Sequence, residues 1–267
     1  MAEAILDFWT NDLQALSDML KKSPNSPTPE LNENPIIKLG KYGFQLPWLM
    51  ASQNNSTAAI NNLRRIGCRS EDRKDETDRI ELRLGDLFRS KGFAVVHSYQ
   101  PDLVNGKDPG EVDLLCYMDN HLLVLELKST YIRKTKQDAW IHRTNTLRKA
   151  SQQLRQKENA IAQAIVNDAN LQAKLRLSDQ KDAIKIHPWI VDTSIEYDQE
   201  LIDGYLKVSL EGLIVILNNE RELLTGNLLI EEELPEDDMF SEGFSVQRFV
   251  EIVEKGELWS VLEVRHE

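Results

Sequence analysis

Apolar and polar residues follow regular periods over the central part of the chain. Residues 93–98, 112–118 and 122–128 are short apolar runs of a length typical of β-strands. Residues 75–91, which precede them, repeat apolar side chains at helical spacing, and a longer helical pattern covers about 145–176. This order of elements predicts an α/β domain in which helices flank a mixed β-sheet.

Residues that favour helix ends sit at the borders of two of these patterns. Asp75 and Thr77 are alternative N-terminal caps for the first helix, and Gly92 follows its expected C-terminus. Near the end of the chain, a closing helix is expected over 244–255 with Ser245 as its cap. The borders are therefore predicted from local chemistry as well as from periodicity.

Three further strands are expected after the long helix, over 184–191, 207–217 and, more weakly, 228–232. Pro188 lies inside the first of them, which is typical of an edge strand or a bulge. The long helical pattern itself is interrupted near 167–170.

The pattern before about residue 70 is weaker. Residues 1–20 have a loosely helical apolar face, 22–36 hold four prolines and many small polar residues, and 55–66 read as a short helix. We therefore expect an N-terminal helical and loop extension over 1–70, followed by the main domain over 71–267.

Composition adds little beyond the class of protein. Of 267 residues, 41% are apolar and 28% charged, which is ordinary for a soluble globular protein. No apolar run approaches the roughly 18 residues that a membrane helix needs. The two cysteines do not require an oxidising compartment. A cytoplasmic protein with no membrane partner is expected.

Charge is distributed unevenly along the chain. The net charge is −12, but residues 195–267 carry 19 acidic and 5 basic residues and residues 1–194 are slightly positive. The segment 128–157 holds nine basic residues and one acidic residue, and its His142 is expected at the surface. This segment is either a surface for a phosphate backbone or a solvated helix. The acidic part could contact a protein partner or simply be solvated. The candidate phosphate contacts are Arg133, Lys134, Lys136, Arg143 and Arg148.

A hairpin in the centre of the chain carries the candidate chemistry. If Asp119 and Asn120 form a two-residue turn, Asp113 lies opposite Glu126 with Cβ atoms roughly 4.5–5.5 Å apart. Lys128 then shares a face with Glu126 because strand side chains alternate. Two carboxylates that close repel each other unless a cation lies between them. The hairpin therefore predicts a site for a divalent metal, and the lysine suggests phosphate chemistry.

Asp113, followed after twelve residues by Glu126-Leu127-Lys128, resembles the signature of the PD-(D/E)xK nucleases. Glu81 lies on the helix before the first strand, where related nucleases often have a further acidic metal ligand. The resemblance covers roughly residues 73–195. It implies a restriction-endonuclease-like core with the element order αβββαβ.

The resemblance also implies roles for these residues. Asp113, Glu126 and the backbone carbonyl of Leu127 would bind Mg²⁺ or Mn²⁺, and Glu81 would complete the site. Lys128 would orient the attacking water or stabilise charge on the phosphate. The implied activity is hydrolysis of phosphodiester bonds, most directly in DNA, in restriction, repair or defence. Nucleases that cut both strands of a duplex are often dimers, so a homodimer is possible.

The chain departs from the family pattern in two places. Its literal Pro101-Asp102 pair lies in a loop, about eleven residues before Asp113, and is interpreted as a chance match. The glutamine and tyrosine that some relatives carry on the following helix are not both present, although Gln153 could still contact substrate. Two alternatives stay open: a nucleic-acid-binding module without catalysis, and a protein-interaction subunit of the same fold.

Overall fold

The computed structural model describes residues 6–22, 31, 34–45, 47, 70–129, 136–177, 183–221 and 238–259. By its internal contacts the chain divides into two compact units, Met1–Lys74 and Asp75–Glu267, which are treated separately below. The helix expected over 55–66 and the strand expected over 228–232 lie outside the described residues.

The first unit contains a small sheet beside a short helix. Its elements are β1 (Thr10–Asp12), α2 (Leu13–Lys22), β2 (Ile36–Leu39) and β3 (Tyr42–Gln45). Strand β2 pairs with β1 in parallel and with β3 in antiparallel. A continuous helix over 1–20 was therefore the wrong expectation. The Asp12 carboxylate accepts hydrogen bonds from the backbone N–H groups of Gln14 and Ala15, so the helix begins only after the strand.

A six-stranded sheet forms the centre of the second unit, in the order β4-β5-β6-β7-β9-β8. Strand β6 pairs in parallel with β7, and β7 with β9, while the other neighbours are antiparallel. The predicted α/β class with a mixed sheet is therefore confirmed. The strands are β4 (Ala94–Tyr99), β5 (Val112–Met118), β6 (His121–Lys128), β7 (Lys185–Asp192), β8 (Leu201–Ile202) and β9 (Tyr205–Ser209).

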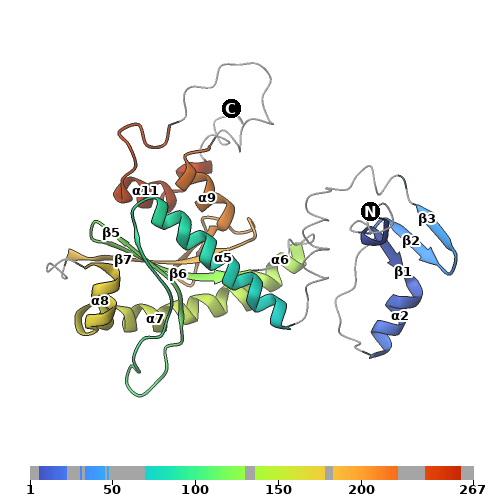
Figure 1. Ribbon diagram of the computed structural model, residues 1–267, viewed down its shortest axis with the longest axis horizontal. Helices are drawn as coiled ribbons and strands as arrows, with labels where there is room; N and C mark the ends of the chain where they lie inside the picture. The colour runs from blue at the N-terminus through green and yellow to red at the C-terminus, as the bar shows by residue number, and fades with distance from the viewer. Residues whose placement is uncertain are drawn as a thin grey trace. The chain divides into compact units, whose positions relative to one another are not determined.

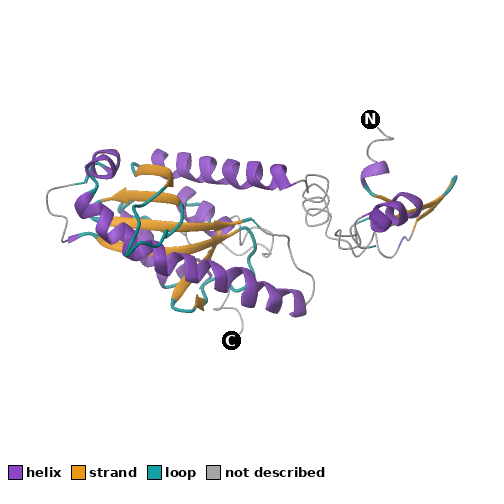
Figure 2. Ribbon diagram, turned by 90° about the horizontal axis from the view of Figure 1, so that it is seen from below, coloured by secondary structure: helices purple, strands orange, loops and turns teal. Residues whose placement is uncertain are grey.

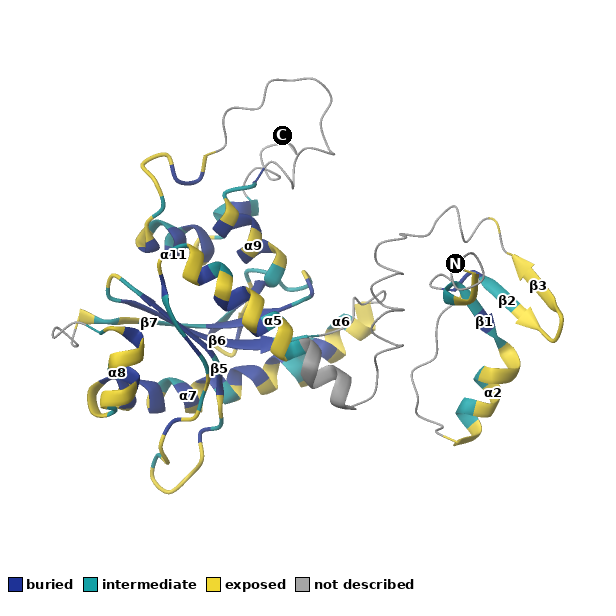
Figure 3. Cartoon of the chain, viewed as in Figure 1, coloured by how far each residue is buried: buried dark blue, intermediate teal, exposed yellow. Residues whose placement is uncertain are grey.

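Helices cover both faces of this sheet (Figures 1 and 2). One apolar core lies between the sheet and α7 and α8, and the other between the sheet and α5, α9 and α11. Figure 3 shows the strands as largely buried between these helices. In the part of the chain that the structure describes, no helix is both long and apolar enough to cross a membrane. The helices are α5 (Ser70–Ser90), α6 (Lys136–His142), a π-helical turn (Arg143–Leu147), α7 (Arg148–Asn167), α8 (Ala169–Leu175), α9 (Leu210–Asn218), α11 (Val246–Glu254) and a 3₁₀ turn (Glu257–Trp259).

Several predicted helix ends are confirmed, but the long helix expected over about 145–176 is preceded without a break by α6 and a π-helical turn, from Lys136 onward. Gly92 follows α5 with a φ of +98°, and the Ser245 hydroxyl caps α11 by accepting from the Arg248 N–H. The break between α7 and α8 is at Asp168, whose carboxylate accepts from two N–H groups of the new helix. The start of α5 was wrong, because the helix already begins at Ser70 rather than at Asp75 or Thr77.

The strand expected over 207–217 is only partly a strand. Strand β9 ends at Ser209, whose hydroxyl accepts from the Gly212 N–H and starts α9. Leu213, Ile216 and Leu217 of this helix are all fully buried. A short helix with so much buried surface gives a continuous apolar run, which sequence periodicity does not distinguish from a buried strand.

Strand β7 is an internal strand, although Pro188 suggested an edge or a bulge. Pro188 lies opposite Val124 of β6, and the pairing with β9 begins one residue later, at Trp189. Pro188 therefore has a neighbouring strand on one side only, which is where a residue without an N–H is tolerated.

Candidate active site at one end of the β5–β6 hairpin

The hairpin forms with the predicted turn and register. Asp119 and Asn120 have positive φ angles of 45° and 62°, as a two-residue turn of type I′ requires. The pairing runs from Met118 opposite His121 to Leu114 opposite Leu125. The next pair in this register is Asp113 and Glu126, which places both carboxylates at the same end of the hairpin.

These carboxylates lie in a cleft of about 440 Å³. The cleft is built from α5, the loop before β5, the ends of β5 and β6, and α7. It brings together Glu81, Asp113, Glu126 and Lys128, the four residues predicted to be catalytic, and Leu127 and Gln153 also line it. The full lining is Thr77, Glu81, Gly110, Glu111, Asp113, Glu126, Leu127, Lys128, Ser129, Gln153 and Lys157.

Two lysines hold the central carboxylate. Glu126, only 1% exposed, accepts a hydrogen bond from Lys128 Nζ at 2.5 Å through Oε1, and Lys157 Nζ bonds its other oxygen. The Lys157 ammonium is also 3.9 Å from Asp113 Oδ1. It therefore contacts both of the carboxylates whose mutual repulsion was expected to require a divalent ion. A protein cation therefore reduces this repulsion as well, which the sequence did not predict.

Lys157 was missed because it was counted as part of a basic surface segment. It belongs instead to the buried stripe of α7, with Leu154 three residues before it and Ile161 four residues after it. Lys157 as a whole residue is 2% exposed. A lysine at a core-facing helical position needs a buried anion, so the spacing itself contained a signal that its partner is a carboxylate.

Asp113 is held by the backbone as well as by charge. Its Oδ2 accepts a hydrogen bond of 2.6 Å from the Leu127 N–H. Burial and the nearby Glu126 carboxylate raise the pKa of Asp113 to about 6, against the opposing effect of Lys157. The carboxylate is therefore fixed in orientation but is not fully compensated in charge.

Glu81 enters the cleft from α5 and is 8% exposed. Burial raises the pKa of Glu81 to about 8, and the Asp113 carboxylate contributes next. The cleft thus holds more acidic side chains than lysines, and at neutral pH a carboxyl group with the pKa of Glu81 keeps its proton. A further cation near these side chains would lower the pKa of both acids.

The donor chemistry of the cleft fits a hard divalent cation. Carboxylate oxygens of Asp113, Glu126 and Glu81 are the ligand type that Mg²⁺ and Mn²⁺ prefer. Within the described ranges, however, no three His, Cys, Asp or Glu side chains are already grouped as a metal site. A cation bound by Glu126 would therefore compete with the Lys157 ammonium for that carboxylate.

The remaining predicted residues are distributed differently. Gln153 lines the cleft, and its buried Oε1 has no hydrogen-bond partner among the described residues. Arg143 pairs with Glu200, and Arg148 Nε is 3.4 Å from Asp203 Oδ2, so acidic residues after β7 already neutralise part of the basic segment. Lys136 is exposed at the start of α6, whereas Arg133 and Lys134 lie outside the described residues.

His142 was expected at the surface and is buried instead. Its Nε2 lies 2.7 Å from Asp192 Oδ2, at the end of the strand that pairs with β6. This histidine thus belongs to the interior of the domain and is not a phosphate contact.

No family model, no curated protein and no solved structure matches this chain. The resemblance to the PD-(D/E)xK nucleases accordingly depends on the residues of the motif.

Proposed function

We propose that this protein is a metal-dependent phosphodiester hydrolase that acts on nucleic acid, most directly on DNA. The observation that carries the proposal is the cleft in which Asp113, Glu126 and Lys128 from adjacent strands meet Glu81 from α5. The order α5, β4, β5, β6, α7, β7 also agrees with the αβββαβ core that the resemblance implies. Fold order alone does not determine activity, so the site is the main support.

Each group in the cleft has a chemical task in such a reaction. A divalent cation held by Asp113, Glu126 and the Leu127 carbonyl would supply positive charge to the phosphate and lower the pKa of water. Lys128, whose side chain is 21% exposed, is able to reach a phosphate oxygen or the attacking water. The oxygen of a water molecule adds to phosphorus and one phosphorus–oxygen ester bond breaks, and the proton that the water gives up is balanced by the one that the leaving alkoxide takes up.

Lys157 favours a second candidate function. Its ammonium already lies between Asp113 and Glu126, so the two carboxylates tolerate burial without a metal. A protein that keeps this arrangement permanently would bind nucleic acid without cleaving it. The two candidates differ in one respect: whether a divalent cation enters the cleft.

The deciding experiment is a cleavage assay with supercoiled plasmid, linear duplex, single-stranded DNA and RNA. Each substrate is incubated with Mg²⁺, Mn²⁺ or EDTA. We expect cleavage only with metal, and a loss of at least about a hundredfold in Asp113→Asn and in Lys128→Ala. Circular dichroism shows whether each variant is folded.

Two matched substitutions serve as controls. Asp86→Asn removes an exposed carboxylate from α5 that pairs with Arg89, and Lys174→Ala removes an exposed lysine from α8. Both variants should cleave like the unmodified protein. Binding of DNA without cleavage under any metal would support the second candidate, and cleavage in EDTA would contradict the metal-dependent mechanism.

A further inference from the structure

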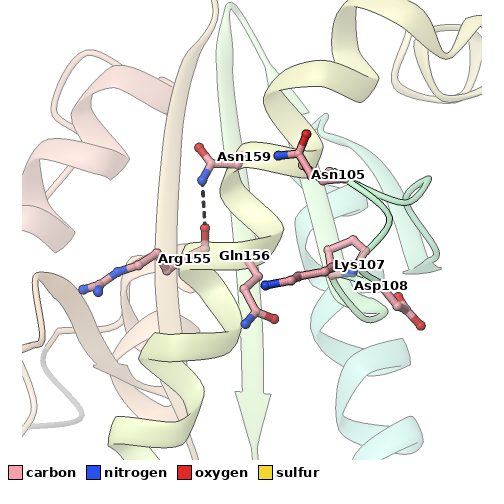
Figure 4. A pocket seen from close by; sticks show the side chains of 8 residues that line it. Asn105, Lys107, Asp108, Arg155, Gln156 and Asn159 are labelled. Atoms are coloured by element: carbon pink, nitrogen blue, oxygen red, sulfur yellow. Dashed lines mark hydrogen bonds between the residues drawn. The ribbon is translucent and has the colours of Figure 1, made fainter.

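A second cleft, of about 390 Å³, lies between the loop before β5 and helix α7 (Figure 4). Its volume is in the range of pockets that hold one small organic ligand. No residue of this cleft belongs to the predicted catalytic set. The lining residues are Val104, Asn105, Lys107, Asp108, Pro109, Arg155, Gln156 and Asn159.

Hydrogen bonds within the loop hold the loop side of this cleft. Val104 and Lys107 exchange two backbone hydrogen bonds of 3.0 Å, and Asn105 and Gly106 between them have positive φ angles. The Asp108 carboxylate then accepts from the Gly110 N–H at 2.8 Å and from the Gln100 side chain at 2.9 Å. A wall fixed in this way loses little conformational entropy when a ligand binds.

The second cleft adjoins the carboxylate cleft along two shared elements. The loop lines the second cleft up to Pro109 and the carboxylate cleft from Gly110 onward. Helix α7 contributes Gln156 to the second cleft and Lys157 to the carboxylate cleft. Lys157 Cε is 3.8 Å from the position that a Cβ on Gly110 would take, so loop and helix touch where the two clefts meet. A chain-like ligand whose phosphate occupies one cleft would therefore extend into the other.

The lining chemistry suits a heterocyclic base more than a second phosphate. Figure 4 shows Asn105 and Lys107 on the loop side and Gln156 and Asn159 on the helix side. The side-chain amides of Asn105 and Gln156 can both donate to and accept from a base edge, whereas the Asn159 amide already donates to the Arg155 carbonyl at 3.3 Å. Val104 and Pro109 add apolar surface against which a base can lie.

Only limited positive charge faces this cleft. Arg155 lines it with its stem, but its guanidinium donates to the Asp203 carbonyl at 3.2 Å and points away from the loop in Figure 4. Lys107 is exposed and is the group that would meet a phosphate at the rim.

We propose that the cleft between the Val104–Pro109 loop and α7 binds one unpaired nucleotide of the substrate, adjacent to the phosphate in the carboxylate cleft. The choice of a nucleotide as the ligand rests on the proposed function. Amides read a base only when its hydrogen-bonding edge is accessible, which in a duplex requires a frayed end, a tail or a displaced base. The substrate is thus a nucleic acid with a single-stranded segment next to the cleaved bond.

The proposal is tested with fluorescein-labelled oligonucleotides in EDTA, where binding is measured without cleavage. The probes are a single strand, a duplex with an unpaired tail and a blunt duplex of the same sequence. We expect binding to the first two to be at least about tenfold tighter than to the blunt duplex. Asn105→Ala combined with Gln156→Ala should remove most of this preference and leave binding of the blunt duplex unchanged.

Controls separate this proposal from the hydrolase proposal. Lys174→Ala, an exposed lysine on α8, should leave both affinities unchanged, whereas Lys107→Ala should weaken binding of the tailed probe. If the double variant prefers single strands as strongly as the unmodified protein does, the nucleotide site is wrong, whether or not the protein cleaves DNA. If the variants lose the preference but no metal supports cleavage, the nucleotide site stands and the hydrolase proposal fails. No binding of any probe would overturn the nucleotide site, whereas the hydrolase proposal is decided by the cleavage assay with metal.

Discussion

Two clusters of buried charge lie near the same end of the sheet, and they differ in how their charges are matched. In the open cluster, which we define as Glu81, Asp113, Glu126, Lys128 and Lys157, three carboxylates face two ammonium groups around a cleft. The pKa of Glu81 and that of Asp113 are both raised, first by burial and then by a neighbouring carboxylate.

The closed cluster lies at the ends of β7 and β9, and we define it as His142, Asp192, Ser194, Asp198, Lys207 and Ser209. Asp192 Oδ2 accepts from the Ser194 hydroxyl at 2.6 Å and lies 2.7 Å from His142 Nε2. Lys207 Nζ donates to the Ser194 carbonyl at 2.5 Å and is 3.8 Å from Asp198 Oδ1. Within this group each charge has a bonded partner.

Buried charge alone therefore does not indicate function. The closed cluster shows that this fold can bury carboxylates with hydrogen-bond or ion-pair partners, because hydroxyls, a histidine and a lysine converge on them. The open cluster keeps acidic groups with raised pKa values beside a cleft, which is an arrangement that functional sites share.

The largest effect is expected from removing one charge in the closed cluster. Asp192→Asn weakens two buried contacts, with His142 and Ser194, and should lower the free energy of unfolding by about 3 kcal/mol or more. Asp113→Asn removes a carboxylate that repels Glu126 in the open cluster and should change the free energy of unfolding by less than about 1 kcal/mol. Urea unfolding in EDTA measures both. Equal losses of unfolding free energy in the two variants would contradict the difference between the clusters in how their charges are matched.

The next effect depends on metal. Lys157→Met leaves Asp113 and Glu126 facing each other without the ammonium, so the protein should be less stable in EDTA. Mg²⁺ should then recover stability, by about 2.7 kcal/mol at a concentration about a hundredfold above its dissociation constant. Lys207→Met in the closed cluster is the matched control and should gain nothing from Mg²⁺. If Mg²⁺ does not stabilise the Lys157→Met protein, the result would favour the second candidate function, which is nucleic-acid binding without cleavage.

The contrast between the clusters also explains what the sequence could predict. The hairpin was predictable because its register depends on a local two-residue turn, and Asp113 opposite Glu126 follows from that register. Lys157 occupies a buried helical position that the sequence pattern contains, but only tertiary folding shows that the hairpin carboxylates are its partners. His142 and Asp192 are also far apart in the sequence, and the apolar and polar pattern around each of them does not indicate that their side chains meet.

The misread strand has a related cause. Residues 207–217 are apolar throughout, and periodicity does not reveal that Ser209 ends β9 and caps α9. The hydroxyl of Ser209 bonds the Asp198 carboxylate in the closed cluster as well as the Gly212 N–H. The capping role of Ser209 is thus evident from the structure, whereas the sequence alone does not show whether its hydroxyl caps a helix.

A smaller effect is expected from pH in the absence of metal. The pKa of Glu81 in the folded protein is about 8, raised from 4.5 by burial and then by Asp113. Because the folded state holds this proton more tightly, the stabilisation is fully present below about pH 4.5 and is lost as pH rises toward 8. Urea unfolding in EDTA should therefore show stability falling across this window, and Glu81→Gln should flatten the slope. If Glu81→Gln leaves the pH dependence of the free energy of unfolding unchanged, a group other than Glu81 binds the proton.

The smallest effect concerns the surface beyond both clusters. Arg148 and Asp203 form an exposed ion pair of 3.4 Å, and such pairs contribute at most about 1 kcal/mol to stability. Arg148→Ala should therefore hardly change the free energy of unfolding. Its effect on DNA binding should also be small, because Asp203 opposes any attraction of the guanidinium to phosphate.

Lys136, which is exposed on α6, is the matched comparison for Arg148. If it contacts a phosphate, Lys136→Ala should reduce the slope of log affinity against log salt by about 0.9, the expected change for one contact with duplex DNA. Arg148→Ala should reduce the slope less, and Asp203→Ala should increase it by freeing Arg148. A full loss of one contact in Arg148→Ala would mean that DNA displaces Asp203, and that the acidic residues after β7 shield the basic segment until substrate arrives.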